Sequence, residues 1–501
     1  MSYNQAAHQE NRAVVQSLEP SLLWQWFARI CAIAHPSDYE EALAQDIVAW
    51  AKSVNLPVRR DQVGNVIITK PATQGMQDRA KIALQAHLDM VPQANADTVH
   101  DFTIDPIRLR FNPQDEAWLM ATGTTLGADN GIGMASCLAV LQSQDIAHPE
   151  IEVLLTMTEE TGMEGVFGLQ PNELSAEIMI NTDTEEIGEV YIGCAGGINA
   201  DVVLPIERVP SQFDTAFTLE LKGLRGGHSG IDIHKNRGNA IKILARILAK
   251  LQQSELPFAL IDVKGGTLRN AIPRESFAVL ACHQADFDKI STLLNENIAQ
   301  IHQEISVAEP KFVATIATAD LPSEHLSVQN SQTIVHLLNA LPSGVVRNSD
   351  TVADTVETSL SFGKVSIVDG KLKAVLLVRS LIETGKEAIC GVIDSTAKLA
   401  GATASFDGDY VGWNPDANSA ITPLTVELYT KILGKQPEVK VIHAGLECGL
   451  IKKSHPNMDI VSIGPTIKNA HSPDEMVHIQ SVATYWQLLT DILANAPKAK
   501  N

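Results

Sequence analysis

Histidine and carboxylate side chains stand at the ends of apolar runs in five separate segments of this chain. They are His87, Asp129, Glu160, Asp183 and His471, with Asp89 and Glu159 close beside two of them. Two histidines with three carboxylates suit zinc, cobalt or manganese, because calcium prefers oxygen ligands alone and structural zinc sites prefer thiolates. The carboxyl ends of parallel strands are also where an α/β sheet presents functional groups. The set therefore predicts a centre for two divalent metals.

His87 and Asp89 close the apolar run KIALQA. Alternate residues of an extended strand face the same side, so these two side chains point together. His87 can then offer a ring nitrogen to a metal while Asp89 supports a ligand and fixes its tautomer and aim. A histidine and an aspartate at this spacing also occur as core or capping residues, so the pair alone leaves both interpretations open.

Two turns supply further carboxylates. Asp129 lies in the stretch GADNGIG, where it can cap a helix predicted over residues 130–142 and also bridge two cations with its two oxygens. Glu159 and Glu160 follow the strand pattern IEVLLTMT. Adjacent residues point in different directions, so one glutamate can bind metal while the other handles the proton of a water. An exposed acidic turn is the alternative for this pair.

Asp183 ends the run IMINTD, and His471 lies in the loop GPTIKNAHSPDE, where a solvated histidine is the alternative. Two divalent cations carry four positive charges, three carboxylates balance three, and one bridging hydroxide balances the fourth. Bound metals lower the pKa of such a water to about 7. Glu159 would accept its proton and pass it to a leaving amine, which predicts hydrolysis of an amide bond.

Alternating strand and helix patterns frame these residues. Residues 21–53 have helical spacing with a break at His35-Pro36, and a short apolar helix is predicted over residues 130–142. Strand patterns cover residues 66–69, 82–86, 153–157, 178–181 and 190–193. This alternation predicts an α/β layer with a mainly parallel sheet.

The pattern changes after residue 197. Residues 198–405 contain amphipathic strands and two or three helices, including helices near 239–251 and 387–399. The α/β pattern returns after residue 405, with helices near 422–432 and 479–494 and a strand at 461–464. We therefore predict a catalytic domain of residues 1–197 and 406–501, with an α+β domain of residues 198–405 inserted into it.

The length, charge and cysteine content of the chain indicate its number of domains and argue against some classes of partner. A length of 501 residues suits two or three domains, and 38 basic against 59 acidic residues give a net charge of −21. This charge argues against a nucleic-acid or anionic-membrane partner. Six dispersed cysteines without a C-x-x-C pair predict reduced thiols. No apolar run approaches the roughly 20 residues of a membrane helix, and the start has no signal core, so we expect a cytoplasmic protein.

The motifs together resemble the M20 metallopeptidases, and among them the cytosolic aminoacyl-histidine dipeptidases. The resemblance extends over nearly the whole chain, through LQAHLDMVP, GTTLGADNGIGMA, LTMTEETGMEG, INTDTEE, GGHSG, GGTLRNAIPRE, HAGLECG and SIGPTIKNAHSPDE. It implies two metal ions, zinc in the first place with cobalt or manganese as alternatives. One ion would be held by His87, Asp129 and Asp183, and the other by Asp129, Glu160 and His471. Glu159 is then implied as the general base, and Asp89 as the residue that orients His87.

The resemblance also makes the inserted segment a lid domain. His228 in GGHSG would stabilise the oxyanion, Asn270 in RNAIP would contact substrate, and Arg379 in LLVRSL would bind the substrate carboxylate. A structural turn, a cap or a surface charge is the alternative for each. The segment is nearly twice as long as the lid of simple members, in which a partner subunit supplies the histidine. The histidine that stabilises the oxyanion can therefore come either from the same chain or from a partner subunit.

We expect hydrolysis of unblocked dipeptides, preferentially Xaa-His. The site indicates the reaction class, whereas the histidine preference is implied only by the resemblance. A related deacylase or tripeptidase is an alternative, and so is a metal-dependent peptide-binding protein without catalysis, against which Glu159 argues. The expected partners are a small dipeptide and, as an open alternative, a second copy of the chain in a homodimer.

Overall fold

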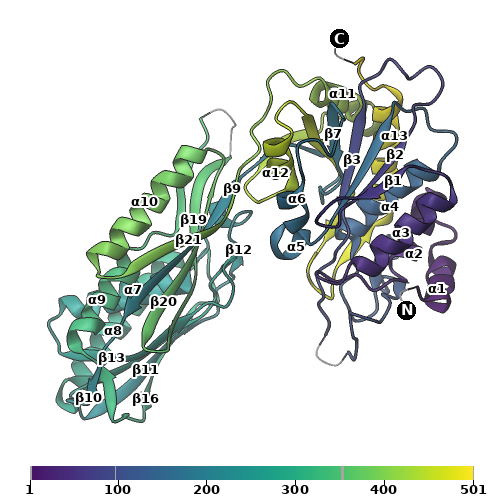
Figure 1. The fold of residues 1–501 in the computed structure, drawn as a ribbon. Helices are drawn as coiled ribbons and strands as arrows, with labels where there is room; N and C mark the ends of the chain where they lie inside the picture. Colours follow the sequence, from purple (N-terminus) through teal and green to yellow (C-terminus); the bar gives the residue numbers. More distant parts are fainter. Residues whose placement is uncertain (1–2, 96–97, 351–354, 500–501) are drawn as a thin grey trace. The chain divides into compact units, whose positions relative to one another are not determined.

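The apolar runs that precede His87, Glu160, Asp183 and His471 form neighbouring strands of one eight-stranded sheet (Figure 1), in the order β1-β2-β6-β3-β7-β23-β8-β22. The computed structural model describes residues 3–95, 98–350 and 355–499. The strands are β1 (Val58–Arg60), β2 (Val66–Lys70), β3 (Ile82–His87), β6 (Ile151–Thr156), β7 (Ile178–Asn181), β8 (Glu189–Cys194), β22 (Glu438–Ile442) and β23 (Asp459–Ser462).

Parallel pairs lie at the centre of this sheet. Strand β3 lies between β6 and β7 and runs parallel to both, and β23 runs parallel to β7. The pairs β1/β2, β2/β6 and β23/β8 are antiparallel. The register places His87 opposite Thr156 and Gln85 opposite Asn181. The carboxyl ends of β3, β6 and β7 therefore meet at one edge, where His87, Glu159, Glu160 and Asp183 follow.

Helices pack against this sheet, and apolar side chains between the helices and the sheet form a core. They are α1 (Gln5–Val15), α2 (Ser21–Ile30), α3 (Glu41–Ser53), α4 (Ala128–Gln142), α5 (Glu159–Gly162), α6 (Glu164–Gly168), α11 (Ile421–Leu433), α12 (Glu447–Ser454) and α13 (Ile479–Ala494). Small and apolar residues fill α4, which packs against α2 and β3 and is buried along nearly all its length. A four-stranded sheet has the order β24 (Ile467–Lys468), β25 (Met476–His478), β5 (Trp118–Ala121) and β4 (Leu109–Phe111).

The chain divides into two compact units. The first contains Met1–Cys194, Trp413–Val441 and Leu446–Asn501, and the second contains Ala195–Gly412 and Ile442–Gly445. The second unit has a nine-stranded antiparallel sheet in the order β16-β11-β15-β13-β19-β20-β9-β21, with β18 paired to β19. These strands are β9 (Gly196–Pro205), β11 (Thr215–Lys222), β13 (Phe258–Gly265), β15 (Ser276–Cys282), β16 (Val313–Ala319), β18 (Gly344–Asn348), β19 (Val356–Val368), β20 (Lys371–Ser380) and β21 (Thr403–Tyr410).

The second unit also has helices and two short strand pairs. The pairs are β10 (Arg208–Pro210) with β17 (Glu324–Leu326) and β12 (Gly227–His228) with β14 (Ala271–Ile272). The helices are α7 (Ala240–Gln253), α8 (Gln284–Ile305), α9 (Val328–Ala340), α10 (Glu383–Leu399) and the short η1 (Ile233–Lys235). The prediction of two or three helices was therefore wrong, because the described residues form four α-helices. Helix α8 buries only Ile290, Leu294 and Ile301, which makes its apolar face narrow.

The prediction of an α/β fold with an α+β segment is confirmed, with the refinement that the first sheet contains antiparallel as well as parallel pairs. Among the described residues, no helix combines the length and the apolar character that crossing a bilayer requires.

Candidate metal centre

Five side chains from five segments converge at the carboxyl edge of the first sheet. His87 Nε2 lies 3.2 Å from Asp129 Oδ1 and 3.4 Å from Asp183 Oδ1. His471 Nε2 lies 3.2 Å from Asp129 Oδ2 and 3.1 Å from Glu160 Oε1. Among the described residues, three groups of possible ligands result. They are His87 with Asp129 and Asp183, Asp129 with Glu160 and His471, and His87 with Glu159 and Glu160. Asp129 belongs to the first two groups and faces one imidazole with each oxygen.

Asp89 supports this centre from within the protein. Its Oδ1 lies 3.3 Å from His87 Nδ1, and its two oxygens accept the backbone N–H groups of Glu159 at 2.9 Å and Glu160 at 3.1 Å. Ser37 Oγ donates a further hydrogen bond to Asp89 at 2.8 Å. The backbone carbonyl of Asp89 lies 3.0 Å from the same His87 Nδ1. The carbonyl and carboxylate of Asp89 thus position the His87 ring together, and the carboxylate holds the turn that carries both glutamates.

The turn before Glu159 has an uncommon backbone conformation. Thr158 has a φ of 54°, which a β-branched residue rarely adopts. Its N–H and hydroxyl donate to the buried carboxylate of Glu40 at 2.8 and 3.0 Å. His471 also has a left-handed backbone, with a φ of 63°. Strained conformations of this kind persist where the surrounding structure holds them, often at functional sites.

Asp129 does not cap a helix, contrary to the prediction. Its φ and ψ of −85° and 106° are not helical, Gly127 precedes the first turn of α4, and the Asp129 carboxylate faces the two histidines. The N–H groups of residues 126–129 instead donate to Glu475. The next residue, Asn130, donates from Nδ2 to Asp183. The side chain of Asp129 is therefore free of a capping role and directed into the centre.

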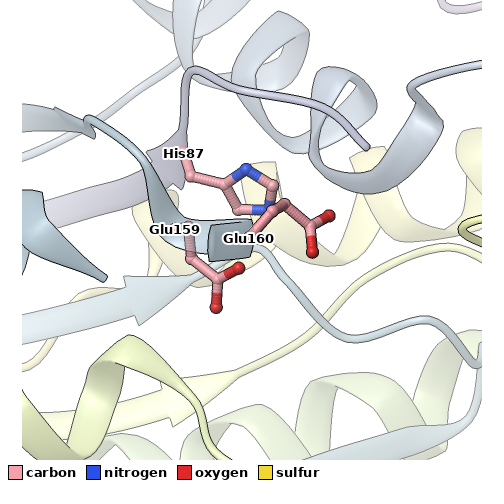
Figure 2. A group of neighbouring side chains, drawn as sticks. All are labelled: His87, Glu159 and Glu160. Atoms are coloured by element: carbon pink, nitrogen blue, oxygen red, sulfur yellow. The ribbon is translucent and has the colours of Figure 1, made fainter. Parts of the chain in front are cut away.

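Glu159 and Glu160 leave the chain in different directions from the start of α5, as Figure 2 shows beside His87. Burial raises the pKa of Glu159 well above its usual range, and the carboxylates of Glu160 and Asp183 add to this effect against the opposing charge of His87. Burial and Asp129 raise the pKa of Glu160 to about 7, although His471 opposes the shift. The two neighbours therefore share one acidic environment but face different parts of it.

The neighbouring carboxylates also raise the pKa values of the two imidazoles, His87 and His471. Burial lowers the pKa of His87, but Asp183, Asp129 and Asp89 together raise it well above its usual value. Burial likewise lowers the pKa of His471, and Asp129 and Glu160 outweigh this to bring it to about 11. In the described part of the chain, neither lysine nor arginine pairs with Asp129, Glu160 or Asp183. The centre thus concentrates negative charge that divalent cations could neutralise, and its nitrogen and oxygen donors fit zinc, cobalt or manganese.

Glu447 lies behind the centre at the start of α12. It is fully buried, and its Oε2 accepts hydrogen bonds from Gln85 Nε2 at 2.5 Å and Thr156 Oγ1 at 2.8 Å. Oε1 has no hydrogen-bond partner among the described residues. Burial raises the pKa of Glu447 to about 8, against the opposing charge of His87. In the sequence, the motif HAGLECG predicted for Glu447 either a place near a substrate amine or a part in the packing of a glycine-rich turn.

The three predicted residues of the inserted segment lie together within the second unit. His228 pairs with Ala271 across β12 and β14, and Ser229 N donates to Asn270 O at 2.9 Å. A Cβ atom at Gly230 would lie 3.2 Å from Arg379 Cδ, so the His228 loop reaches Arg379 on β20. The second unit thus brings His228, Asn270 and Arg379 to one end.

Sequence reasoning missed several residues that support these side chains. Glu475, Glu40 and Ser37 hold ligand-bearing turns in the first unit. In the second unit, Tyr410 accepts from Arg379 Nη1 at 2.8 Å. Each acts on a partner at least 31 residues away in the chain, so no local spacing could have identified it. His443, for which the motif HAGLECG predicted either a place near a substrate amine or turn packing, lies in the second unit with Nε2 at 2.7 Å from Ser359 Oγ.

Comparison with known proteins gives one consistent family. The M20 family model named Peptidase dimerisation domain matches residues 219–307. The cytosol non-specific dipeptidase of Escherichia coli (strain K12) is 52% identical over 485 residues, which cover 96% of this chain and 99% of that protein. The structure of aminoacylhistidine dipeptidase from Vibrio alginolyticus has a TM-score of 0.84 and 48% identity, covering 97% of this chain and 99% of that one.

A more distant structure shares only the fold. An M20 family metallo-carboxypeptidase from Sulfolobus solfataricus has a TM-score of 0.51 and 13% identity, covering 94% of this chain and 98% of that chain. The resemblance identified from the motifs is confirmed by the similarity along nearly the whole chain. This protein belongs to the M20 peptidase family.

Proposed function

We propose that this protein is a two-metal dipeptidase that hydrolyses unblocked dipeptides. The observation that carries the proposal is the pair of ligand groups that share Asp129, with Glu159 beside them. His87, Asp129 and Asp183 would hold one divalent cation, and Asp129, Glu160 and His471 the other. Zinc is the proposed ion, with cobalt or manganese as functional replacements. When bound, such cations lower the pKa of a water and polarise a carbonyl.

Glu159 is the proposed general base. Its side chain leaves the turn away from Glu160 (Figure 2), so it remains available to a water while Glu160 faces His471. Glu159 would accept a proton from the attacking water and return it to the leaving amine. Asp89 would act through the bonds described above, by holding the His87 ring and the Glu159 backbone in place.

The second unit would supply the recognition of the substrate. Arg379 is 6% exposed, its Nε has no hydrogen-bond partner, and no carboxylate pairs with it among the described residues. A buried charge without a counterion is costly, and a planar guanidinium suits a carboxylate. These features support binding of the C-terminal carboxylate of the substrate to Arg379. His228 is proposed to stabilise the oxyanion and Asn270 to contact the substrate.

The proposal also specifies which dipeptides the protein accepts. The name of the Vibrio relative specifies aminoacylhistidine substrates, whereas the name of the Escherichia coli relative specifies non-specific dipeptidase activity. We propose preference for histidine at the C-terminal position within a range of accepted dipeptides. A cytoplasmic location and assembly into a homodimer are proposed as well, and light scattering on the purified protein tests the latter.

Hydrolysis of a panel tests the function. The panel contains β-Ala-His, Gly-His, Ala-Leu, an N-acetyl dipeptide and a tripeptide, each incubated with zinc-loaded protein. We expect the highest kcat/KM for the Xaa-His members and no cleavage of the blocked peptide. Preferred cleavage of the blocked or longer peptides would instead identify a deacylase or tripeptidase. Absence of all cleavage at full metal occupancy would indicate a peptide-binding protein.

Replacement of Glu159 by glutamine tests the mechanism. The amide cannot accept the proton of the water, so we expect kcat to fall by about 100-fold to 10,000-fold with both metals retained. Metal content measured by mass spectrometry, together with dipeptide turnover, checks this expectation. Asp474→Asn provides a matched control, because Asp474 is exposed on the loop that carries His471. Loss of a metal from the Glu159 variant would make Glu159 a ligand and contradict the assignment.

A further inference from the structure

The buried carboxylate of Glu475 occupies the turn that precedes α4. Its Oε2 accepts the N–H groups of Leu126 at 2.7 Å and Gly127 at 3.0 Å, and its Oε1 accepts those of Ala128 at 2.8 Å and Asp129 at 3.3 Å. Glu475 is 2% exposed. A single side chain thus satisfies four consecutive backbone donors more than 340 residues away in the chain.

The hydrogen-bond donors that the structure shows for the Glu475 carboxylate are these four N–H groups. No lysine or arginine pairs with it in the part of the chain that the structure describes. Consecutive N–H groups that converge on one point form an anion-binding concavity, and hydrogen bonds to an ionised acceptor are stronger than neutral ones. Gly127 supports this curvature with a φ of 67°. The conformation of the turn and the position of the carboxylate therefore depend on each other.

Each of the two segments that meet in this contact also carries a candidate metal ligand. Asp129 is the last residue of the turn, and His471 lies four residues before Glu475. The intervening loop is held by Ser472, whose Oγ donates to Asn469 O at 2.8 Å and whose carbonyl accepts from Glu475 N at 3.0 Å. Beyond the contact, strands β5 and β25 pair with each other. The Asp129 and His471 side chains then meet at 3.2 Å.

We propose that Glu475 is a positioning residue that fixes Asp129 relative to His471 and thereby sets the affinity of the metal that they share. Ligands held in place before the metal binds lose little conformational freedom on binding. Residues that support metal ligands commonly change metal affinity by about 10-fold to 100-fold when they are replaced. The inference rests on the proposed function, because it assumes that Asp129 and His471 bind a divalent cation.

Titration with Co²⁺ tests this role without substrate. In Glu475→Gln, the side-chain NH₂ group replaces one acceptor and faces backbone donors, so the turn can no longer be held by four bonds. We expect the affinity for one of two Co²⁺ ions to fall by about 10-fold to 100-fold, with a changed Co²⁺ absorption spectrum. Asp474→Asn removes the same charge from the neighbouring exposed residue and should leave both affinities unchanged. Glu475→Asp, whose carboxylate is one methylene shorter, should give an intermediate affinity.

The outcomes separate a positioning role from a purely structural one. A folded Glu475→Gln protein with unchanged Co²⁺ affinities and a lower melting temperature would overturn the proposal. An equal loss of affinity in Asp474→Asn would overturn it too, because general charge would then explain the effect. If Glu475→Gln does not fold, Glu475→Asp decides between the same outcomes. Uptake of a single ion by the unaltered protein would refute the two-metal centre, whereas comparison of the variants for that ion would still decide the role of Glu475.

Discussion

Asp129 and Glu447 are both buried carboxylates of the first unit, but their neighbours give them opposite protonation states. Burial alone would raise the pKa of Asp129, yet His471 and His87 together lower it far below its usual value. Among the described residues, Glu447 receives hydrogen bonds only from the neutral groups of Gln85 and Thr156, and burial raises its pKa to about 8. Asp129 is thus held ionised and Glu447 is held neutral near pH 7.

Glu447 should make stability depend on pH in the protein treated with a chelator. A carboxyl group whose pKa rises from 4.5 to about 8 on folding binds its proton more tightly in the native state. Its contribution to stability is therefore complete below about pH 4.5 and is lost as pH rises through about 8. In Glu447→Gln, the carbonyl can accept from Gln85 and Thr156 while the NH₂ group takes the position of the unpaired Oε1. This variant has no such loss.

We expect the free energy of unfolding of Glu447→Gln, relative to the unaltered protein, to increase between pH 5 and pH 8. The slope should be at most about 1.4 kcal/mol per pH unit, the value for one proton. Urea titrations across this range measure it, with Glu116→Gln as the control at an exposed position. A difference between Glu447→Gln and the unaltered protein that stays constant with pH would show that Glu447 does not titrate in this way.

At the scale of elements, helix α4 approaches the carboxyl ends of the central strands very closely. A Cβ atom at Gly133 would lie 1.9 Å from Asn130 Oδ1, 2.2 Å from Thr182 Oγ1 and 2.8 Å from Thr182 O. Thr182 precedes the candidate ligand Asp183, and Asn130 follows Asp129 and bonds to Asp183. The absence of a side chain at residue 133 therefore allows two ligand-bearing segments to lie side by side.

Replacing Gly133 by alanine should separate these segments. We expect a loss of at least about 1–3 kcal/mol in the free energy of unfolding from overpacking, together with weaker metal binding. Gly391→Ala in the exposed part of α10 is the matched control, since no atom lies within 4 Å of its added Cβ. Alanine is favoured over glycine in a helix by about 1 kcal/mol, so this control should gain stability. Urea unfolding and metal analysis of both variants provide the measurement, and a Gly133→Ala protein as stable as the original would contradict the close packing.

At the scale of the whole molecule, the candidate metal ligands and Arg379 belong to different units. The first unit holds all five candidate ligands together with Asp89 and Glu159, and the second holds His228, Asn270 and Arg379. Each unit has its own apolar core, one around α4 and the first sheet and the other around α7 and the antiparallel sheet. Metal binding should therefore stabilise the first unit specifically.

Removal of metal should lower the melting temperature of the first unit alone. Without cations, the stabilisation of the folded first unit by a bound ligand is lost. This stabilisation is about 4 kcal/mol at a free metal concentration of 1,000 times Kd. Calorimetry before and after chelation, followed by addition of Zn²⁺, should show one metal-dependent transition and one that does not move. Equal shifts of both transitions would contradict a centre confined to the first unit.

The residues of the candidate centre could be selected from the sequence because each follows a local pattern. His87, Glu160 and Asp183 follow apolar strands, and the motifs around them were sufficient to identify the family. Helix α13 was predicted with the bounds Ile479–Ala494 that the structure shows, because its apolar residues recur at helical spacing. Helix α8 was not predicted, because only three of its 22 residues are buried and its pattern is weak.

The sequence by itself determined which side chains could bind metal, which strands carry them and to which family the chain belongs, since all three depend on neighbours along the chain. Only the tertiary structure decided that β3 lies between β6 and β7, that Asp129 faces two imidazoles instead of capping a helix, and that Glu475 holds the turn before α4. These contacts join residues tens to hundreds of positions apart. They form only when the whole sheet and its loops come together, and no local spacing encodes them.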